Sequence, residues 1–117
     1  MIYTSYFSSK KYNKADGVSI ARWSDFWNGD TYFDLYPNKD LLVWWKNLPE
    51  EARNDSHYQQ LYSTYYQQEI LDKLDPHKVA SDLENRVLLC YEKSSDFCHR
   101  YIVATWLRQY GYEVEEL

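Results

Sequence analysis

The chain has 117 residues and a formal charge of −5, with 13 Lys and Arg against 18 Asp and Glu, and this length fits one compact domain over residues 1–117. The acidic balance excludes a general nucleic-acid-binding role, because affinity for phosphate backbones comes mainly from clustered Lys and Arg. No apolar stretch approaches the roughly 20 residues of a membrane helix, and the first residues lack a signal-peptide pattern. We therefore expect a cytoplasmic protein with no membrane partner.

Two short strands are predicted in the N-terminal part of the chain. Residues 2–7 are rich in β-branched and aromatic side chains, which favour extended structure. Residues 18–23 follow the turn signal Asp16-Gly17 and have the same character. Residues 24–39 mix aromatic side chains with turn-forming residues and predict a long loop, a kind of segment that is often functional in small domains.

Three helices are predicted in the middle of the chain. The first covers residues 40–46, with Asp40 as its N-cap. The second covers residues 56–74, where apolar side chains recur at spacings of three and four. The third starts at Asp75-Pro76, an N-cap residue followed by proline at the first helical position.

The C-terminal part predicts a strand, a helix and a second strand. Residues 86–91 are a continuous apolar run, typical of a strand buried on both faces of a parallel sheet. A helix over residues 97–110 follows, capped by residues 94–96, with Gly111 at the position where helices commonly end. Residues 112–115 alternate and predict an edge strand.

This order of elements predicts a small α/β fold, a mainly parallel sheet flanked by helices in a Rossmann-like three-layer arrangement. In such folds ligands bind beyond the carboxyl ends of the strands, where the helices that follow begin. The residues that this rule selects as ligand-binding candidates are Thr4, Ser5, Tyr6, Arg22, Trp23, Lys93, Cys98, His99 and Arg100.

The start of the last helix is the most informative of these segments. Unpaired backbone amides at a helix N-terminus attract anions, and Arg22 or Arg100 could hold a phosphate or carboxylate in a bidentate fork. The same amides would lower the pKa of Cys98. Simpler roles stay open: Arg100 could pair with Asp96 or Glu92, and Cys98 could be a small buried side chain.

No cofactor is predicted, because the common nucleotide-binding and hydrolase signatures are absent. Two cysteines and three scattered histidines fit no structural zinc spacing, so we expect no metal either.

Several segments resemble a known family. Residues 88–93, followed by residues 96–100 and 104–107, resemble the domain of unknown function 488 family, with a strand that ends in a cysteine and an acidic residue before a Cys-His-Arg helix start. Residues 2–6 and 19–23 look like the short, phage-associated branch of that family. The resemblance implies an α/β fold and leaves the activity open.

Three functions remain as alternatives. The first is a binding domain for a phosphate-bearing, nucleotide-derived small molecule, with Arg22 on the charged part and Tyr6, Trp23 and the aromatic side chains of residues 24–36 on a base. In a phage, such a protein could act in the host cytoplasm against host defence by sequestering a nucleotide signal of immunity.

The second function is an enzyme that acts on a nucleotide or nucleoside derivative at the same crevice. Its catalytic candidates are Cys98 as nucleophile, Glu92 as base and His99 as proton carrier. The third is a protein-binding inhibitor whose contact surface would be residues 62–66 and 113–117.

We also expect a homodimer, because the chain has more aromatic side chains than one thin domain should bury. The residues behind this expectation are Trp44, Trp45, Tyr58, Tyr62, Tyr65 and Tyr66.

Overall fold

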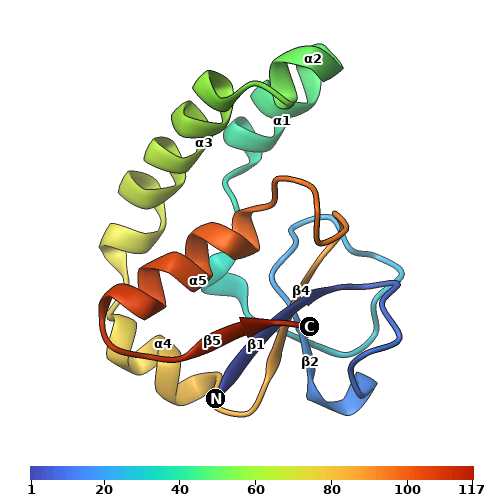
Figure 1. Cartoon of the computed structure of the whole chain (residues 1–117), viewed down its shortest axis with the longest axis vertical. Coiled ribbons are helices and arrows are strands. Elements are labelled where there is room, and N and C mark those ends of the chain that lie inside the picture. Colours follow the sequence, from blue (N-terminus) through green and yellow to red (C-terminus); the bar gives the residue numbers. More distant parts are fainter.

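The computed structural model describes all 117 residues as an α/β fold around a single sheet (Figure 1). All strand pairs are parallel, and the five strands lie in the order β3-β2-β4-β1-β5. The strands are Ile2–Tyr6 (β1), Gly17–Ser19 (β2), Asp30–Thr31 (β3), Val87–Cys90 (β4) and Val114–Glu116 (β5). The predicted parallel sheet with flanking helices is thus confirmed, and the last strand lies at an edge as expected.

Strand β4 is central because its side chains are apolar on both faces. Leu88 joins the main core on one face, and both Leu88 and Leu89 are fully buried. On the other face Leu89 and Trp27 crowd Gly17, where an added Cβ would lie 2.7 Å from Cδ1 of Leu89. A side chain at Gly17 would therefore displace the packing of this face.

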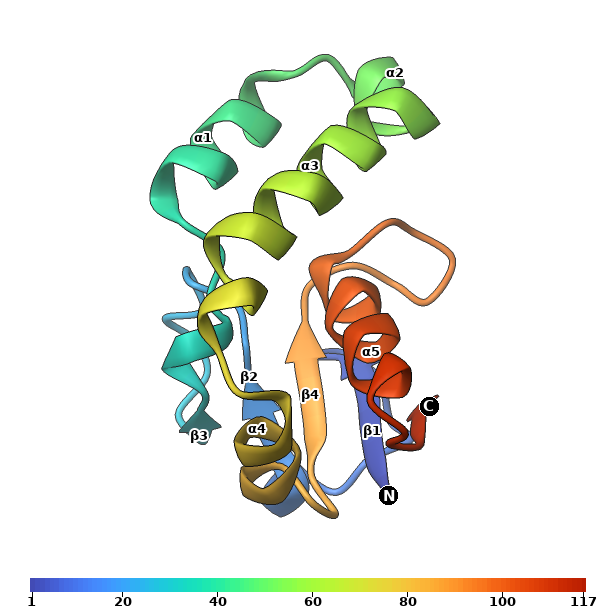
Figure 2. The same cartoon turned by 90° about the vertical axis from the view of Figure 1, so that its left-hand side faces the viewer.

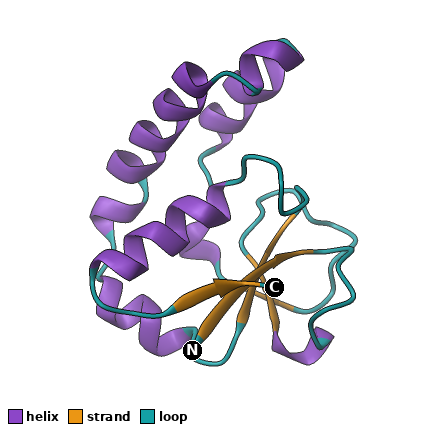
Figure 3. Cartoon of the chain, in the orientation of Figure 1, coloured by secondary structure: helices purple, strands orange, loops and turns teal.

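Helices cover one face of the sheet, and loops with a short 3₁₀ turn cover the other (Figures 2 and 3). Helix α1, the short helix α2 and the first turns of α3 extend beyond the carboxyl ends of the strands, whereas α4 and α5 lie against the sheet (Figures 1 and 2). The helices are Lys39–Asn47 (α1), Glu50–Arg53 (α2), Ser56–Glu69 (α3), Pro76–Asp82 (α4) and His99–Gln109 (α5).

Local signals set several helix ends as predicted. The carboxylate of Asp55 accepts a hydrogen bond from the amide of His57 at 2.8 Å and caps α3. Asp75 caps α4 in the same way, with Pro76 at the first position. Gly111, with φ of +90°, follows α5 in a conformation that other residues rarely adopt.

The structure corrects three predicted boundaries in the first part of the chain. Helix α1 is preceded by Asn38 rather than capped by Asp40, and α3 ends at Glu69, followed by the 3₁₀ turn Leu71–Lys73. The second strand ends at Ser19, four residues early. There the hydroxyl of Ser19 accepts a hydrogen bond from the amide of Ala21, which draws this backbone group away from the sheet.

Helix α5 begins two residues later than predicted. Its N-cap is Cys98, and the first helical residue is His99. Asp96 does not cap it; the amide of Asp96 closes a separate turn onto the carbonyl of Lys93. The polar residues before the helix therefore form a loop, and Cys98 itself lies at the helix start.

Much of the aromatic side-chain surface is buried in the core. Tyr62 and Tyr66 of α3 are 3% and 0% exposed, and the Tyr66 hydroxyl donates to the carbonyl of Leu35 at 2.6 Å. Trp45 packs against the same core, whereas Trp44 and Tyr65 are exposed. The surface predicted for a homodimer or a protein inhibitor is therefore smaller than its sequence indicated.

None of the helices combines the length and the apolar character that crossing a bilayer requires.

Candidate functional site

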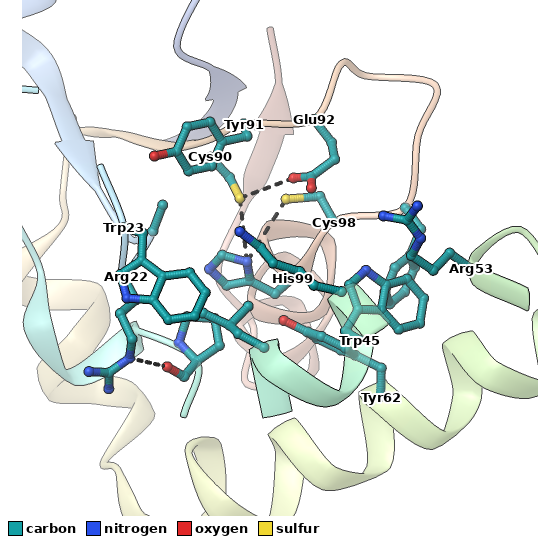
Figure 4. Close-up of a pocket in the computed structure, with 15 residues that line it drawn as sticks. Arg22, Trp23, Trp45, Arg53, Tyr62, Cys90, Tyr91, Glu92, Cys98 and His99 are labelled. Atoms are coloured by element: carbon teal, nitrogen blue, oxygen red, sulfur yellow. Dashed lines mark hydrogen bonds between the residues drawn. The ribbon is translucent and has the colours of Figure 1, made fainter. Parts of the chain in front are cut away.

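A pocket of about 110 Å³ lies where β2 and β4 end and α5 begins (Figure 4). This is the edge of a parallel sheet at which ligands are expected. Strands β1 and β2 flank β4, with Tyr6 beside Cys90 and Ser19 beside Leu89. In Figure 4, Arg22 and Trp23 lie on one side of the pocket and Trp45 and Arg53 on the other, with the sulfur and imidazole groups between them.

Four reactive side chains form the floor of the pocket: Cys90, Glu92, Cys98 and His99. Nδ1 of His99 lies 3.4 Å from Sγ of Cys90 and 3.9 Å from Sγ of Cys98. The Cys90 thiol donates to Oε2 of Glu92 at 3.4 Å. These polar atoms therefore contact one another, although they come from the end of a strand, a loop and the start of a helix.

The imidazole of His99 is held in one orientation. Its Nε2 lies 2.9 Å from the carbonyl oxygen of Ile20, which can only accept, so Nε2 carries a hydrogen. Nδ1 is then the ring nitrogen that faces the two sulfur atoms, where it accepts a hydrogen bond in the neutral ring and donates one in the protonated ring. The side chain is 5% exposed, so water competes little for this arrangement.

The surroundings of the two thiols shift their pKa values in opposite directions. Burial and the neighbouring Cys98 raise the pKa of Cys90 well above its usual value. Burial also disfavours a thiolate at Cys98, but hydrogen bonds from Cys90 and His99, together with the charges of His99 and Arg100, lower its pKa well below the usual value. Of the two thiols, Cys98 is therefore the one that ionises more readily.

The carboxyl group of Glu92 is shifted toward its protonated form. Burial raises its pKa above the ordinary value, and the neighbouring Cys98 adds to this effect. The floor therefore combines a thiol that ionises readily with a carboxyl group that retains its proton to higher pH.

Three cationic side chains line the same pocket: Arg22, Lys46 and Arg53. None of them has a carboxylate within 4.0 Å. Nε of Arg22 donates to the carbonyl of Pro37 at 2.7 Å, and the ammonium of Lys46 lies 4.6 Å from the ring centre of Trp23. Nε of Arg53 is buried and has no hydrogen-bond partner.

Aromatic side chains form the walls between these cations. Trp45 contacts Tyr62 and Phe97, with ring centres 5.2 and 5.3 Å away. Trp23 and Tyr91, at the mouth, are 39% and 46% exposed. The pocket thus offers flat apolar surfaces beside positive charge.

The structure brings together part of the predicted site. Arg22, Trp23, Glu92, Cys98 and His99 all line the pocket. The other candidates do not line it: Thr4, Ser5, Tyr6, Lys93 and Arg100. The hydroxyl of Thr4 instead donates to Glu116 at 2.6 Å, and the buried Ser5 hydroxyl has no partner.

Arg100 has an internal role that its sequence position did not indicate. It is 0% exposed, and its Nε and Nη2 donate to the two carboxylate oxygens of Glu116 at 3.1 and 3.0 Å. Its Nη1 donates to the carbonyl of Glu92 at 2.7 Å. Because Glu116 belongs to β5, Arg100 ties the last helix to the edge strand and is not available to a ligand.

Sequence reasoning missed the residues that α1, α2 and α3 contribute. Lys46, Arg53, Trp45 and Tyr62 reach the pocket because these helices extend over the carboxyl ends of the strands. No local pattern places them there, since their position depends on how α1 packs on α3. Cys90 was not a site candidate, although its place at the end of the predicted central strand was a usable signal.

The comparisons with known proteins return one result. The model of the family described as the active DUF488-N3 subclade matches residues 4–111. Neither the curated proteins nor the solved structures contain a match to the chain. The match covers β1 from Thr4 onward, the strands β2, β3 and β4, the pocket and helix α5, but not β5. It confirms the resemblance to the domain of unknown function 488 family. The chain therefore belongs to the active DUF488-N3 subclade of the domain of unknown function 488 family.

Proposed function

We propose that the pocket binds a phosphate-bearing, nucleotide-derived small molecule. The observation that carries this proposal is the group of three cationic side chains, Arg22, Lys46 and Arg53, that line one pocket without a carboxylate partner. The chain as a whole has a charge of −5, so acidic partners are plentiful. Three unpaired cations around one cavity favour an anionic ligand.

Arg53 gives the strongest single reason to expect an anion. A buried donor without a partner costs about 1–3 kcal/mol, so such groups are rare unless a ligand or water satisfies them. Nε of Arg53 is a donor of this kind at the pocket wall. A phosphate oxygen there would accept a charge-assisted hydrogen bond, which is shorter and stronger than a neutral one.

The size of the pocket limits how such a ligand can sit. A cavity of about 110 Å³ is smaller than the roughly 300 Å³ at which pockets for drug-sized ligands begin. It has room for a phosphate or a sugar, while a nucleobase would lie at the mouth. There the exposed rings of Trp23 and Tyr91 offer stacking surfaces, worth about 1–3 kcal/mol per base.

A protein of this kind would act by sequestration. In a phage-infected cell it would remove a nucleotide signal of host immunity from the host cytoplasm, without a partner protein. The resemblance of residues 2–6 and 19–23 to the phage-associated branch of the family supports this biological setting.

Isothermal titration calorimetry with ADP-ribose derivatives and cyclic nucleotides tests the proposal. We expect binding of at least one phosphate-bearing compound, with adenosine much weaker. Arg53→Ala should reduce the affinity at least tenfold, because one charge-assisted hydrogen bond is worth about 1.5–3 kcal/mol. Lys39→Ala is the matched control, since Lys39 is exposed on α1 and does not line the pocket. Equal affinities of these variants, or no binding at all, would contradict the proposal.

The floor of the pocket favours a second function, an enzyme that converts the bound nucleotide derivative. Glu92, Cys98 and His99 line the same cavity as the cations, so a bound ligand would contact groups that can carry a proton or a covalent bond. The description of the matched subclade as active agrees with this alternative.

Mass spectrometry of ADP-ribose derivatives after incubation with the protein separates the two functions. An enzyme yields products that disappear with Glu92→Gln, whereas a binding protein returns the ligand unchanged. The same Glu92→Gln variant should leave phosphate-dependent binding in place, because Arg22 and Arg53 are unaltered.

A further inference from the structure

The four polar side chains on the floor of the pocket also have the composition of a metal site. Two thiols, an imidazole and a carboxylate are the ligand types that Zn²⁺ takes in proteins. The ligand atoms of Cys90, Cys98 and His99 all lie within 4.8 Å of one another. Cys90 and Cys98 are each 3% exposed, so these ligands are shielded from bulk water.

The separations between the atoms fit a tetrahedral ion. With bonds of about 2.3 Å to sulfur and about 2.0 Å to nitrogen or oxygen, a tetrahedral site separates a sulfur from a nitrogen or oxygen by about 3.5 Å. Nδ1 of His99 lies 3.4 Å from Sγ of Cys90 and 3.9 Å from Sγ of Cys98. Oε2 of Glu92 lies 3.4 Å from Sγ of Cys90. These three separations match the corresponding edges of a zinc coordination tetrahedron to within a few tenths of an ångström, and Cys90, Cys98 and His99 form the part of the set whose ligand atoms all lie close together.

The hydrogen-bond partner that orients a metal-binding histidine is also present. Metal-binding histidines commonly donate their other ring N–H to a carbonyl or carboxylate, which fixes the ring and exposes the ligating nitrogen. In this protein Nε2 of His99 donates to the carbonyl of Ile20 at 2.9 Å, and Nδ1 faces the sulfur atoms. The ring is therefore oriented for binding through Nδ1 before any ion arrives.

From this geometry we propose that Cys90, Cys98, His99 and Glu92 bind one Zn²⁺ ion at the floor of the pocket. The ligands are the two Sγ atoms, Nδ1 of His99 and the Glu92 carboxylate, as Figure 4 shows them gathered. Cys98 is then a metal ligand and not a free nucleophile. The sequence prediction of no metal rested on spacing along the chain, whereas the members of this set come together only when the end of β4 meets the start of α5.

The proposal does not depend on the organic ligand of the pocket. Zinc binding is measured with the metal alone, and nucleotide binding can be measured on protein stripped with a chelator. Failure of one leaves the other standing, so the two proposals can be rejected separately.

Elemental analysis and zinc titration of the full chain provide the test. We expect one zinc ion per chain in the wild type and loss of zinc in Cys98→Ser. Glu92→Gln should weaken zinc binding by about tenfold or more, as even second-shell changes do at such sites. The control is His57→Gln, since His57 is exposed at the start of α3 and does not line the pocket; it should retain full binding.

Cobalt substitution keeps the test decisive if a cysteine variant fails to fold. Co²⁺ added to the wild-type protein should give the visible bands of a tetrahedral ion and a thiolate charge-transfer band, and Zn²⁺ should abolish both. No zinc uptake by the wild type, an octahedral cobalt spectrum, or zinc retained by folded Cys98→Ser would each overturn the proposal.

Discussion

The protein holds its buried and pocket-lining cations in two different ways. Arg100 lies fully inside the molecule, and the carboxylate of Glu116 binds one edge of its guanidinium group through Nε and Nη2. Arg22, Lys46 and Arg53 line a pocket in which no carboxylate lies within 4.0 Å of their charged groups. A paired, buried cation holds elements of the fold together, whereas unpaired cations around a cavity are available to a ligand.

The paired cation and the pocket adjoin at the start of α5, where His99 and Arg100 are neighbours in sequence. Successive helix residues point about 100° apart, so adjacent side chains rarely serve the same site. His99 faces the pocket, and Arg100 faces β5. Within the sequence Cys98-His99-Arg100, the first two residues therefore line the pocket, and Arg100 joins α5 to β5.

The largest effect is expected from removing the paired cation. Arg100→Met leaves Glu116 without its bidentate partner and removes the ion pair between α5 and β5, and breaking a buried pair of this kind costs about 3 kcal/mol. Urea denaturation should show this loss of unfolding free energy. A loss below about 1 kcal/mol, the range of surface ion pairs, would show that Arg100 is not structural.

The pH dependence of stability should come from the same pair. Burial opposes the charge of Glu116, but hydrogen bonds from Arg100, Ser94 and Thr4 lower its pKa below the ordinary value of 4.5. Because the folded pKa is the lower one, the stabilisation is complete above the unfolded pKa and is lost as pH falls through the folded pKa.

Denaturation of the wild type and Glu116→Gln between pH 7 and pH 3 checks this sign. The difference in unfolding free energy should be largest at pH 7 and should shrink in acid. Its size should be smaller than the effect of Arg100→Met, since Glu116 is partly exposed. A difference that grows in acid would contradict the paired arrangement.

The smallest effect on stability is expected at an unpaired cation. Lys46→Ala should change the unfolding free energy by no more than about 0.5 kcal/mol, because the side chain is exposed and makes no ion pair. Its effect should appear in ligand affinity, which should fall and become less sensitive to salt. If Lys46→Ala lowered the unfolding free energy but left the ligand affinity unchanged, Lys46 would be a structural cation and not a ligand-binding one.

The sequence was most informative where local physics determines the structure. The apolar run that became β4 has few alternatives to burial in a parallel sheet, and Asp55 and Asp75 cap their helices through adjacent amides. Arg22 and Cys98 were also expected in one crevice, because β2 and β4 are neighbours in such folds.

Contacts between distant parts of the chain explain the features that the sequence did not predict. Arg53 reaches the pocket only because α1, α2 and α3 extend over the ends of the strands, which no spacing in the sequence encodes. Arg100 was misassigned because its partner, Glu116, belongs to a strand that pairs with β1 from the other end of the chain. The N-cap of α5 is Cys98 and not the predicted Asp96, because the amide of Asp96 is bonded to the carbonyl of Lys93 in a separate turn.

The comparison between the two groups of cations is tested most directly by the side-chain Nε–H signals of arginine in nuclear magnetic resonance, recorded as ADP-ribose is added. The Arg53 signal should shift strongly, because its Nε has no protein partner, and the Arg100 signal should stay in place against Glu116. Unchanged signals from both Arg53 and Arg22, or a shift at Arg100 alone, would contradict the assignment of the unpaired cations to ligand binding.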